Sequence, residues 1–110
     1  MKPKNQLIYF AYGSNLHPNR LEARIGKSHQ LGLFKLVNYK LNFNKPSNDG
    51  SAKCNISKEQ THCVYGFLYN ITSEQKALLD RFEAGYTTSW MQDKIIGEYF
   101  TYLANPPFSD

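Results

Sequence analysis

The stretch that decides the fold is Leu7-Ile-Tyr-Phe-Ala-Tyr-Gly-Ser-Asn-Leu16. Its first five residues are apolar, which predicts a buried strand over residues 7–11. The small and polar residues Gly13–Asn15 then interrupt the apolar run, and a helix-like segment follows over His17–Ile25. The sequence therefore predicts a tight strand-to-helix turn close to the N-terminus.

This turn has the chemistry of an anion-binding site. The start of a helix leaves backbone NH groups unpaired, and such donors suit a carboxylate or an oxyanion. Gly13 lets the backbone approach a ligand closely, while Ser14 and Asn15 can cap the turn or reach the ligand themselves. The alternative is an ordinary capped connection, because short turns of this composition occur in most folds.

The middle of the chain has the pattern of short strands. We expect strands over residues 29–36, 38–44, 52–57 and 61–70, with a turn at Lys58-Glu59-Gln60. The polar segment 45–51 predicts a loop and is a candidate for a mobile lid. The apolar residues of the first two strands are expected in the core: Leu31, Leu33, Leu36, Tyr39, Leu41 and Phe43.

A second helix and two final strands complete the predicted order. Thr72 with Gln75 forms the pattern of a capping box, which predicts a short helix that ends near residues 83–85. Residues 86–92 and 95–104 predict two more strands. The order predicts a single α+β domain over residues 1–110, with a small, mostly antiparallel, β-barrel-like sheet and two short helices. Because an exposed sheet edge presents unpaired backbone NH and carbonyl groups, we expect closure of the sheet or a homodimer.

Composition narrows the functional classes. Hydrophobic residues make up 41% of the 110 residues and aromatic residues 15%, which predicts one packed domain and argues against disorder. A net charge of +4 favours small anionic ligands, and the lack of a long basic run argues against nucleic acid. No apolar run approaches the length of a membrane span or a signal-peptide core, so we expect a cytoplasmic protein with no membrane partner.

Cysteine and histidine usage predicts neither a structural disulfide nor a metal site. Cys54 and Cys63 are expected to be free thiols, with a disulfide between neighbouring strands as the second possibility. The three histidines, His17, His29 and His62, lack the spacing of metal ligands.

Several segments together resemble the γ-glutamyl cyclotransferase-like family. Tyr12-Gly-Ser-Asn-Leu16 is similar to the loop that follows the first strand in this family, and Leu79-Asp-Arg-Phe-Glu83 is similar to its Leu-Asp-x-x-Glu at the end of a helix. Residues 36–44, 64–69 and 101–104 resemble three of its strands. The resemblance covers nearly the whole chain in the right order.

The resemblance implies an intramolecular acyl transfer. In that reaction the free α-amine of a γ-glutamyl group attacks its own side-chain carbonyl, which closes 5-oxoproline and releases an amine or amino acid without a cofactor. Glu83 matches the catalytic glutamate of the family, which moves the protons. The residues expected to bind the substrate are Tyr12, Gly13, Ser14, Asn15, Leu16 and Tyr86.

Alternatives stay open at this stage. The same fold could serve as a non-catalytic binding domain for a metabolite, or transfer the γ-glutamyl group to a second amine from the same site. Asp80 is either an exposed helix residue or an anchor for the loop, and Tyr12 and Tyr86 could be packing residues. Family members commonly continue beyond the last strand, whereas this sequence stops at Asp110. The resemblance therefore predicts a more open pocket, or one that another subunit covers.

Overall fold

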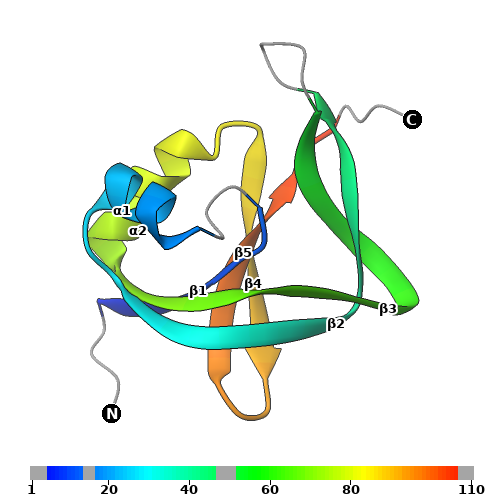
Figure 1. Cartoon of the computed structure of the whole chain (residues 1–110), viewed down its shortest axis with the longest axis horizontal. Helices are drawn as coiled ribbons and strands as arrows, with labels where there is room; N and C mark the ends of the chain where they lie inside the picture. Colours follow the sequence, from blue (N-terminus) through cyan, green and yellow to red (C-terminus); the bar gives the residue numbers. More distant parts are fainter. Residues whose placement is uncertain (1–4, 14–16, 47–51, 107–110) are drawn as a thin grey trace.

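The protein is represented by a computed structural model that describes residues 5–13, 17–46 and 52–106. A five-stranded sheet, in the order β2-β3-β1-β5-β4, carries two helices that lie together on one side of it (Figure 1). The strands are β1 (Gln6–Ala11), β2 (His29–Pro46), β3 (Ala52–Thr72), β4 (Tyr86–Asp93) and β5 (Gly97–Ala104).

The central strand β1 has one antiparallel and one parallel neighbour. It runs antiparallel to β3 over its whole length and parallel to β5, where Tyr9 lies opposite Phe100. The β2–β3 and β4–β5 pairs are both antiparallel. The predicted α+β class with a mostly antiparallel sheet is therefore confirmed. Over the described residues the sheet does not close, so the description as a barrel holds only loosely.

Both helices begin and end at local sequence signals. Helix α1 (Pro18–Ile25) starts at His17, whose Nδ1 accepts a hydrogen bond from the Asn19 NH at 3.3 Å, and Gly26 ends it with a φ of 85°. A glycine suits that position because positive φ strains other residues. The predicted helix is confirmed, with His17 as its cap.

Helix α2 (Ser73–Phe82) carries the predicted capping box. The Gln75 NH donates to Thr72 Oγ1 at 3.1 Å, and the Thr72 NH donates to Gln75 Oε1 at 2.9 Å. Gln75 Nε2 also donates to the carbonyls of Ile25 and Lys27. One side chain therefore caps α2 and holds the end of α1 against it.

The β2–β3 hairpin differs most from the prediction. Four short strands were expected, but the structure has two long ones, and Lys58 of the predicted turn pairs with Tyr39 in the ladder. The ladder is irregular there: its register shifts between Val37 and Tyr39, and Asn38 and Thr61 have φ of 65° and 71°. The polar residues thus mark a kink and not a reversal of the chain, and the outer half of the hairpin bends across the sheet (Figure 1).

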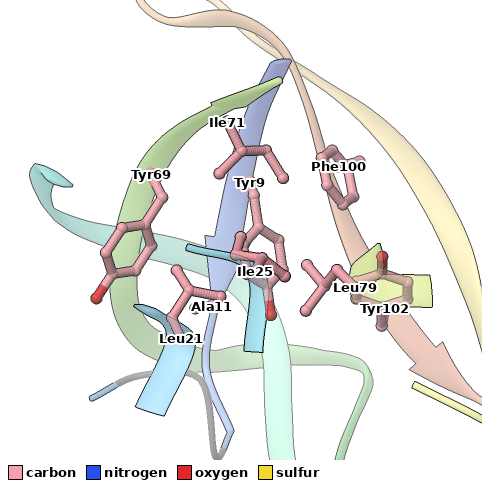
Figure 2. Close-up of a cluster of buried hydrophobic side chains, with 9 residues drawn as sticks. All are labelled: Tyr9, Ala11, Leu21, Ile25, Tyr69, Ile71, Leu79, Phe100 and Tyr102. Carbon is pink, nitrogen blue, oxygen red and sulfur yellow. The ribbon is translucent and has the colours of Figure 1, made fainter. Parts of the chain in front are cut away.

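Two buried clusters lie on the two faces of the sheet. The residues of β1 alternate between them, which explains its unbroken apolar sequence. The cluster beneath the helices, drawn in Figure 2, consists of Tyr9, Ala11, Leu21, Ile25, Tyr69, Ile71, Leu79, Phe100 and Tyr102. The other consists of Ile8, Phe10, Leu36, Ile56, Val64, Leu68 and Tyr99.

The core prediction for β2 is only partly right. Leu36 is buried and Tyr39 packs against the second cluster, as expected. The other four are exposed: Leu31, Leu33, Leu41 and Phe43. Leu33 has an exposed fraction of 66%. The reason is that β2 is an edge strand with a single neighbour, so that its apolar face extends beyond the part that the rest of the molecule covers.

Three smaller points complete the comparison. Cys54 and Cys63 both lie on β3 and are free thiols, as predicted, although the turn expected between them is absent from that strand. The sequence also predicts a bend or bulge at Gly66, but Gly66 pairs with Phe34 without a register shift and marks a close approach of β3 to β1. In the described residues, neither helix has the length and apolar character needed to cross a membrane.

Candidate functional site

A cavity of about 420 Å³ lies where the end of β1, the ends of both helices and the outer half of the β2–β3 hairpin meet. This volume is within the range of small-molecule sites. Residues from all seven helices and strands and from two connections line the cavity: Tyr9, Tyr12, Gly13, Arg24, Phe43, Lys53, Cys54, Phe82, Glu83, Tyr86, Thr101 and Tyr102.

Glu83 is held at the end of α2 by backbone hydrogen bonds. It is the C-cap of the helix, and its NH donates to the carbonyls of Leu79 at 3.1 Å and Asp80 at 3.3 Å. The turn that follows is fastened at two points: the Tyr86 NH donates to the Glu83 carbonyl, and the Asn105 NH donates to the Gly85 carbonyl. The end of α2 is thereby fixed to the end of β5, with the Glu83 side chain at the cavity wall.

Burial changes the acidity of Glu83. Loss of solvent raises the pKa of its carboxyl group, and the nearby carboxylate of Asp80 raises it further. The positive charges of Arg24 and Lys53 act in the opposite direction but do not outweigh the burial. Glu83 therefore keeps its proton to a higher pH than a glutamate on the surface, and its ionised form is a stronger base.

Tyr12 and Tyr86 each donate a hydrogen bond across the cavity wall. The Tyr12 hydroxyl donates to the Tyr102 carbonyl at 2.6 Å, and the Tyr86 hydroxyl donates to the Cys54 carbonyl at 2.5 Å. Burial raises the pKa of both, that of Tyr86 to about 12. Both phenols therefore stay protonated at neutral pH, and each ties together strands that are distant in sequence.

The predicted site residues fall into two groups. Four of them, Tyr12, Gly13, Glu83 and Tyr86, line the same cavity. The other three, Ser14, Asn15 and Leu16, lie outside the described residues. A Cβ atom at Gly13 would lie 3.6 Å from the Cβ of Cys54, so the start of the turn lies directly against β3.

A sequence model of the family described as "Gamma-glutamyl cyclotransferase, AIG2-like" matches residues 9–107. The chain belongs to this family. The family's match therefore includes every residue that lines the cavity. A search of curated protein sequences found no match.

Solved structures share the fold of this γ-glutamyl cyclotransferase family member at low sequence identity. A protein titled "Gamma-glutamyl cyclotransferase" has a TM-score of 0.80 at 22% identity, over 94% of this chain and 69% of that chain. The uncharacterised protein loc79017 from Homo sapiens has a TM-score of 0.81 at 22% identity, over 96% of this chain and 70% of that chain. YkqA from Bacillus subtilis has a TM-score of 0.76 at 20% identity, over 97% of this chain and 43% of that chain. At these identities the likeness shows the fold alone.

Asp80 of the family's Leu-Asp-x-x-Glu segment has a structural role. Its Oδ1 accepts a hydrogen bond from the Tyr102 hydroxyl at 2.6 Å, and its carboxylate pairs with Lys76 at 3.1 Å. The hydrogen bond from Tyr102 joins α2 to β5, which bears the floor of the cavity, while the ion pair with Lys76 lies within α2. Asp80 is thus an exposed helix residue that also holds Tyr102, while residues 14–16 of the turn that it could anchor lie outside the described residues.

The sequence did not identify the two cations at the cavity, Arg24 and Lys53. Arg24 lies in the last turn of α1, where a basic residue is expected simply to complement the helix dipole. Lys53 belongs to a hairpin strand and reaches the site only because that hairpin bends. The described residues contain no cluster of three or more histidine, cysteine or acidic side chains that could hold a metal.

Proposed function

We propose that the chain is a γ-glutamyl cyclotransferase, which converts a γ-glutamyl amine or γ-glutamyl amino acid to 5-oxoproline and releases the amine. The observation that supports this most directly is the position of Glu83. Its carboxyl group, with a pKa raised by burial, shares a small cavity with Gly13, which begins the turn after β1. Membership of the γ-glutamyl cyclotransferase family supports the class of reaction.

The reaction needs positioning and proton transfer and nothing else. The α-amine nitrogen attacks the side-chain carbonyl carbon, so that one C–N bond forms and, when the intermediate collapses, the C–N bond to the departing amine breaks. The attacking nitrogen loses a proton and the departing nitrogen gains one. Since both reacting groups are in one molecule, the enzyme gains rate mainly by folding the substrate into the attack geometry.

Glu83 is the group that we propose moves the proton. As a carboxylate it accepts the proton of the attacking amine, and as an acid it returns that proton to the departing nitrogen. Its raised pKa suits both steps because it lies closer to neutral pH than that of an ordinary glutamate. Backbone NH groups of the turn that starts at Gly13 would stabilise the oxyanion of the intermediate or hold the substrate α-carboxylate.

The test is incubation with a panel of γ-glutamyl amines and γ-glutamyl amino acids, followed by chromatographic detection of 5-oxoproline. We expect release of 5-oxoproline and the free amine in equal amounts. Binding by calorimetry without any product would instead indicate a metabolite-binding domain. A new γ-glutamyl compound, formed only when an acceptor amine is added, would indicate acyl transfer.

Asp80→Asn is expected to shift the pH dependence of the reaction. The acid limb of kcat/KM follows protonation of the base, so with Glu83 in that role its midpoint lies above the ordinary glutamate value of 4.5. Because the Asp80 carboxylate raises the pKa of Glu83, an asparagine there moves the limb to lower pH while it keeps an acceptor for the Tyr102 hydroxyl. The measurement is kcat/KM against pH.

The matched control for this shift is Glu74→Gln, an acidic residue in the first turn of the same helix and outside the cavity. It should leave the midpoint unchanged. A limb that moves to higher pH in Asp80→Asn would contradict the assignment of Glu83 as the base.

A further inference from the structure

The cavity has a buried floor and an exposed mouth. Thr101 and Tyr102 of β5 are almost fully buried, at 0% and 4% exposure. Phe43 and Phe82, which also line the cavity, are 62% and 49% exposed. Lys53 is exposed as well, so the chain places apolar rings and a positive charge where a ligand would enter.

Two cations reach this mouth from different parts of the fold. Arg24 comes from the last turn of α1, and Lys53 from the start of β3. The guanidinium carbon of Arg24 lies 5.4 Å from the centroid of the Phe82 ring, a cation–π contact that holds the charge at the mouth. Both cations are close enough to Glu83 to favour its ionised form, so each acts to lower the pKa of its carboxyl group.

The balance of charge favours an anionic ligand. Among the described residues that line the cavity, Arg24 and Lys53 are the cations and Glu83 is the acidic residue. Even when Glu83 is ionised, two cations face one carboxylate, so these side chains together carry a net positive charge. In a site that excludes part of the solvent, such an excess attracts carboxylates and repels amines.

We propose that Arg24 and Lys53 form an anion subsite at the cavity mouth, which binds the carboxylate of the departing amino acid. The inference depends on the proposed function. The γ-glutamyl half of the substrate, which all substrates share, must lie beside Glu83, so the part that varies extends toward the mouth. Guanidinium and ammonium groups are strong partners for carboxylates. The site therefore selects γ-glutamyl α-amino acids over γ-glutamyl amines.

Three substrates with an anionic, a neutral and a cationic leaving group test the subsite. They are γ-glutamylalanine, its decarboxylated counterpart γ-glutamylethylamide, and the γ-glutamyl amide of 1,4-diaminobutane. We expect kcat/KM to be at least about tenfold higher for the anionic substrate than for the neutral one, which corresponds to about 1.4 kcal/mol. The cationic substrate should be the poorest of the three.

Variants of the two cations should remove the preference selectively. In Lys53→Met and in Arg24→Gln we expect the ratio of kcat/KM for γ-glutamylalanine to that for γ-glutamylethylamide to fall, mainly through a higher KM for γ-glutamylalanine. The ratio removes the effect that loss of either cation has on Glu83, because both substrates share that effect. Lys58→Met is the matched control, because Lys58 lies on the same strand but does not line the cavity. It should keep the wild-type preference.

The outcomes separate the inference from the function on which it rests. If no substrate gives 5-oxoproline, the proposed function fails and the subsite inference fails with it. If all three are converted with equal kcat/KM, the function stands and the inference is overturned. An equal loss for all three substrates in Lys53→Met and Arg24→Gln would also overturn it, because the cations would then hold the shared γ-glutamyl half.

Discussion

Glu83→Gln is expected to lower kcat for 5-oxoproline formation by at least about 100-fold, since positioned acid–base groups contribute about 10² to 10⁴ in rate. Glutamine has nearly the same shape as glutamate, but it can neither accept the proton of the attacking amine nor return it to the departing nitrogen. The γ-glutamyl compound should still bind, because the cavity and its cations are unchanged. The measurements are steady-state kinetics and calorimetry on the same substrate.

Stability distinguishes a catalytic role of Glu83 from a structural one. Burial makes the ionised carboxyl group unfavourable in the folded state, so the neutral amide should not lower the thermal midpoint at pH 7. Glu74→Gln, on the exposed first turn of the same helix, should keep both activity and midpoint within a small change. Wild-type turnover in Glu83→Gln would show that another group moves the proton.

The features that the sequence predicted well depend on nearby residues. The apolar run of residues 7–11 forms the central strand because both of its faces are buried. Thr72 and Gln75 form their capping box within a single helical turn, and Gly26 ends α1 through its own backbone conformation. Such signals require no knowledge of the rest of the fold.

The features that the sequence missed depend on distant contacts. Alternating apolar residues identify a strand with two faces, but they do not tell how far other elements cover each face. Leu33 and Phe43 are therefore exposed although the pattern placed them in the core. For the same reason the polar residues near Lys58 suggested a turn, whereas β3 continues past them and its pairing with β2 resumes at Cys63 after a register shift.

The site was predicted from motifs, and its cations were not. The family resemblance linked Glu83 with the turn after β1, and the structure places Glu83, Tyr12, Gly13 and Tyr86 around one cavity. Lys53 comes close only through the bend of the hairpin, which no local pattern encodes. The roles of these residues stay predictions, as do the homodimer, the cytoplasmic location and the lack of a nucleic-acid partner.

The largest loss of stability is expected for Gly66→Ala. A Cβ atom at this position would lie 2.2 Å from the carbonyl oxygen of Ala11 and 2.7 Å from Cε1 of Phe10. The first of these atoms belongs to the backbone of β1, which is paired on both sides, and the Phe10 ring is fully buried. Neither can move aside cheaply, so we expect the free energy of unfolding to fall by about 3 kcal/mol or more, at the top of the range for overpacked cores.

Urea unfolding followed by the fluorescence of Trp90 measures this loss. Trp90 is the single tryptophan, and its ring centroid lies 5.3 Å from that of the buried Phe100 ring. Gly97→Ala is the control: its φ of 81° strains an alanine, but the added Cβ would meet no described atom within 4 Å. That strain alone should cost about 1 to 2 kcal/mol. If Gly66→Ala loses no more than Gly97→Ala, the close approach of β3 to β1 is wrong.

The same substitution should also impair the site, because Ala11 leads directly into Tyr12 and Gly13. A displacement of the Ala11 carbonyl would move the start of the turn relative to Glu83, which is fixed separately through α2 and the end of β5. We therefore expect kcat/KM of the folded fraction of Gly66→Ala to fall about tenfold or more, since small misplacements of reacting groups are costly. Gly97, in the β4–β5 turn, does not line the cavity, and Gly97→Ala should keep the wild-type value once corrected for its folded fraction. Equal activity in the two variants would mean that β1 can yield at Ala11 without disturbing the geometry of the cavity.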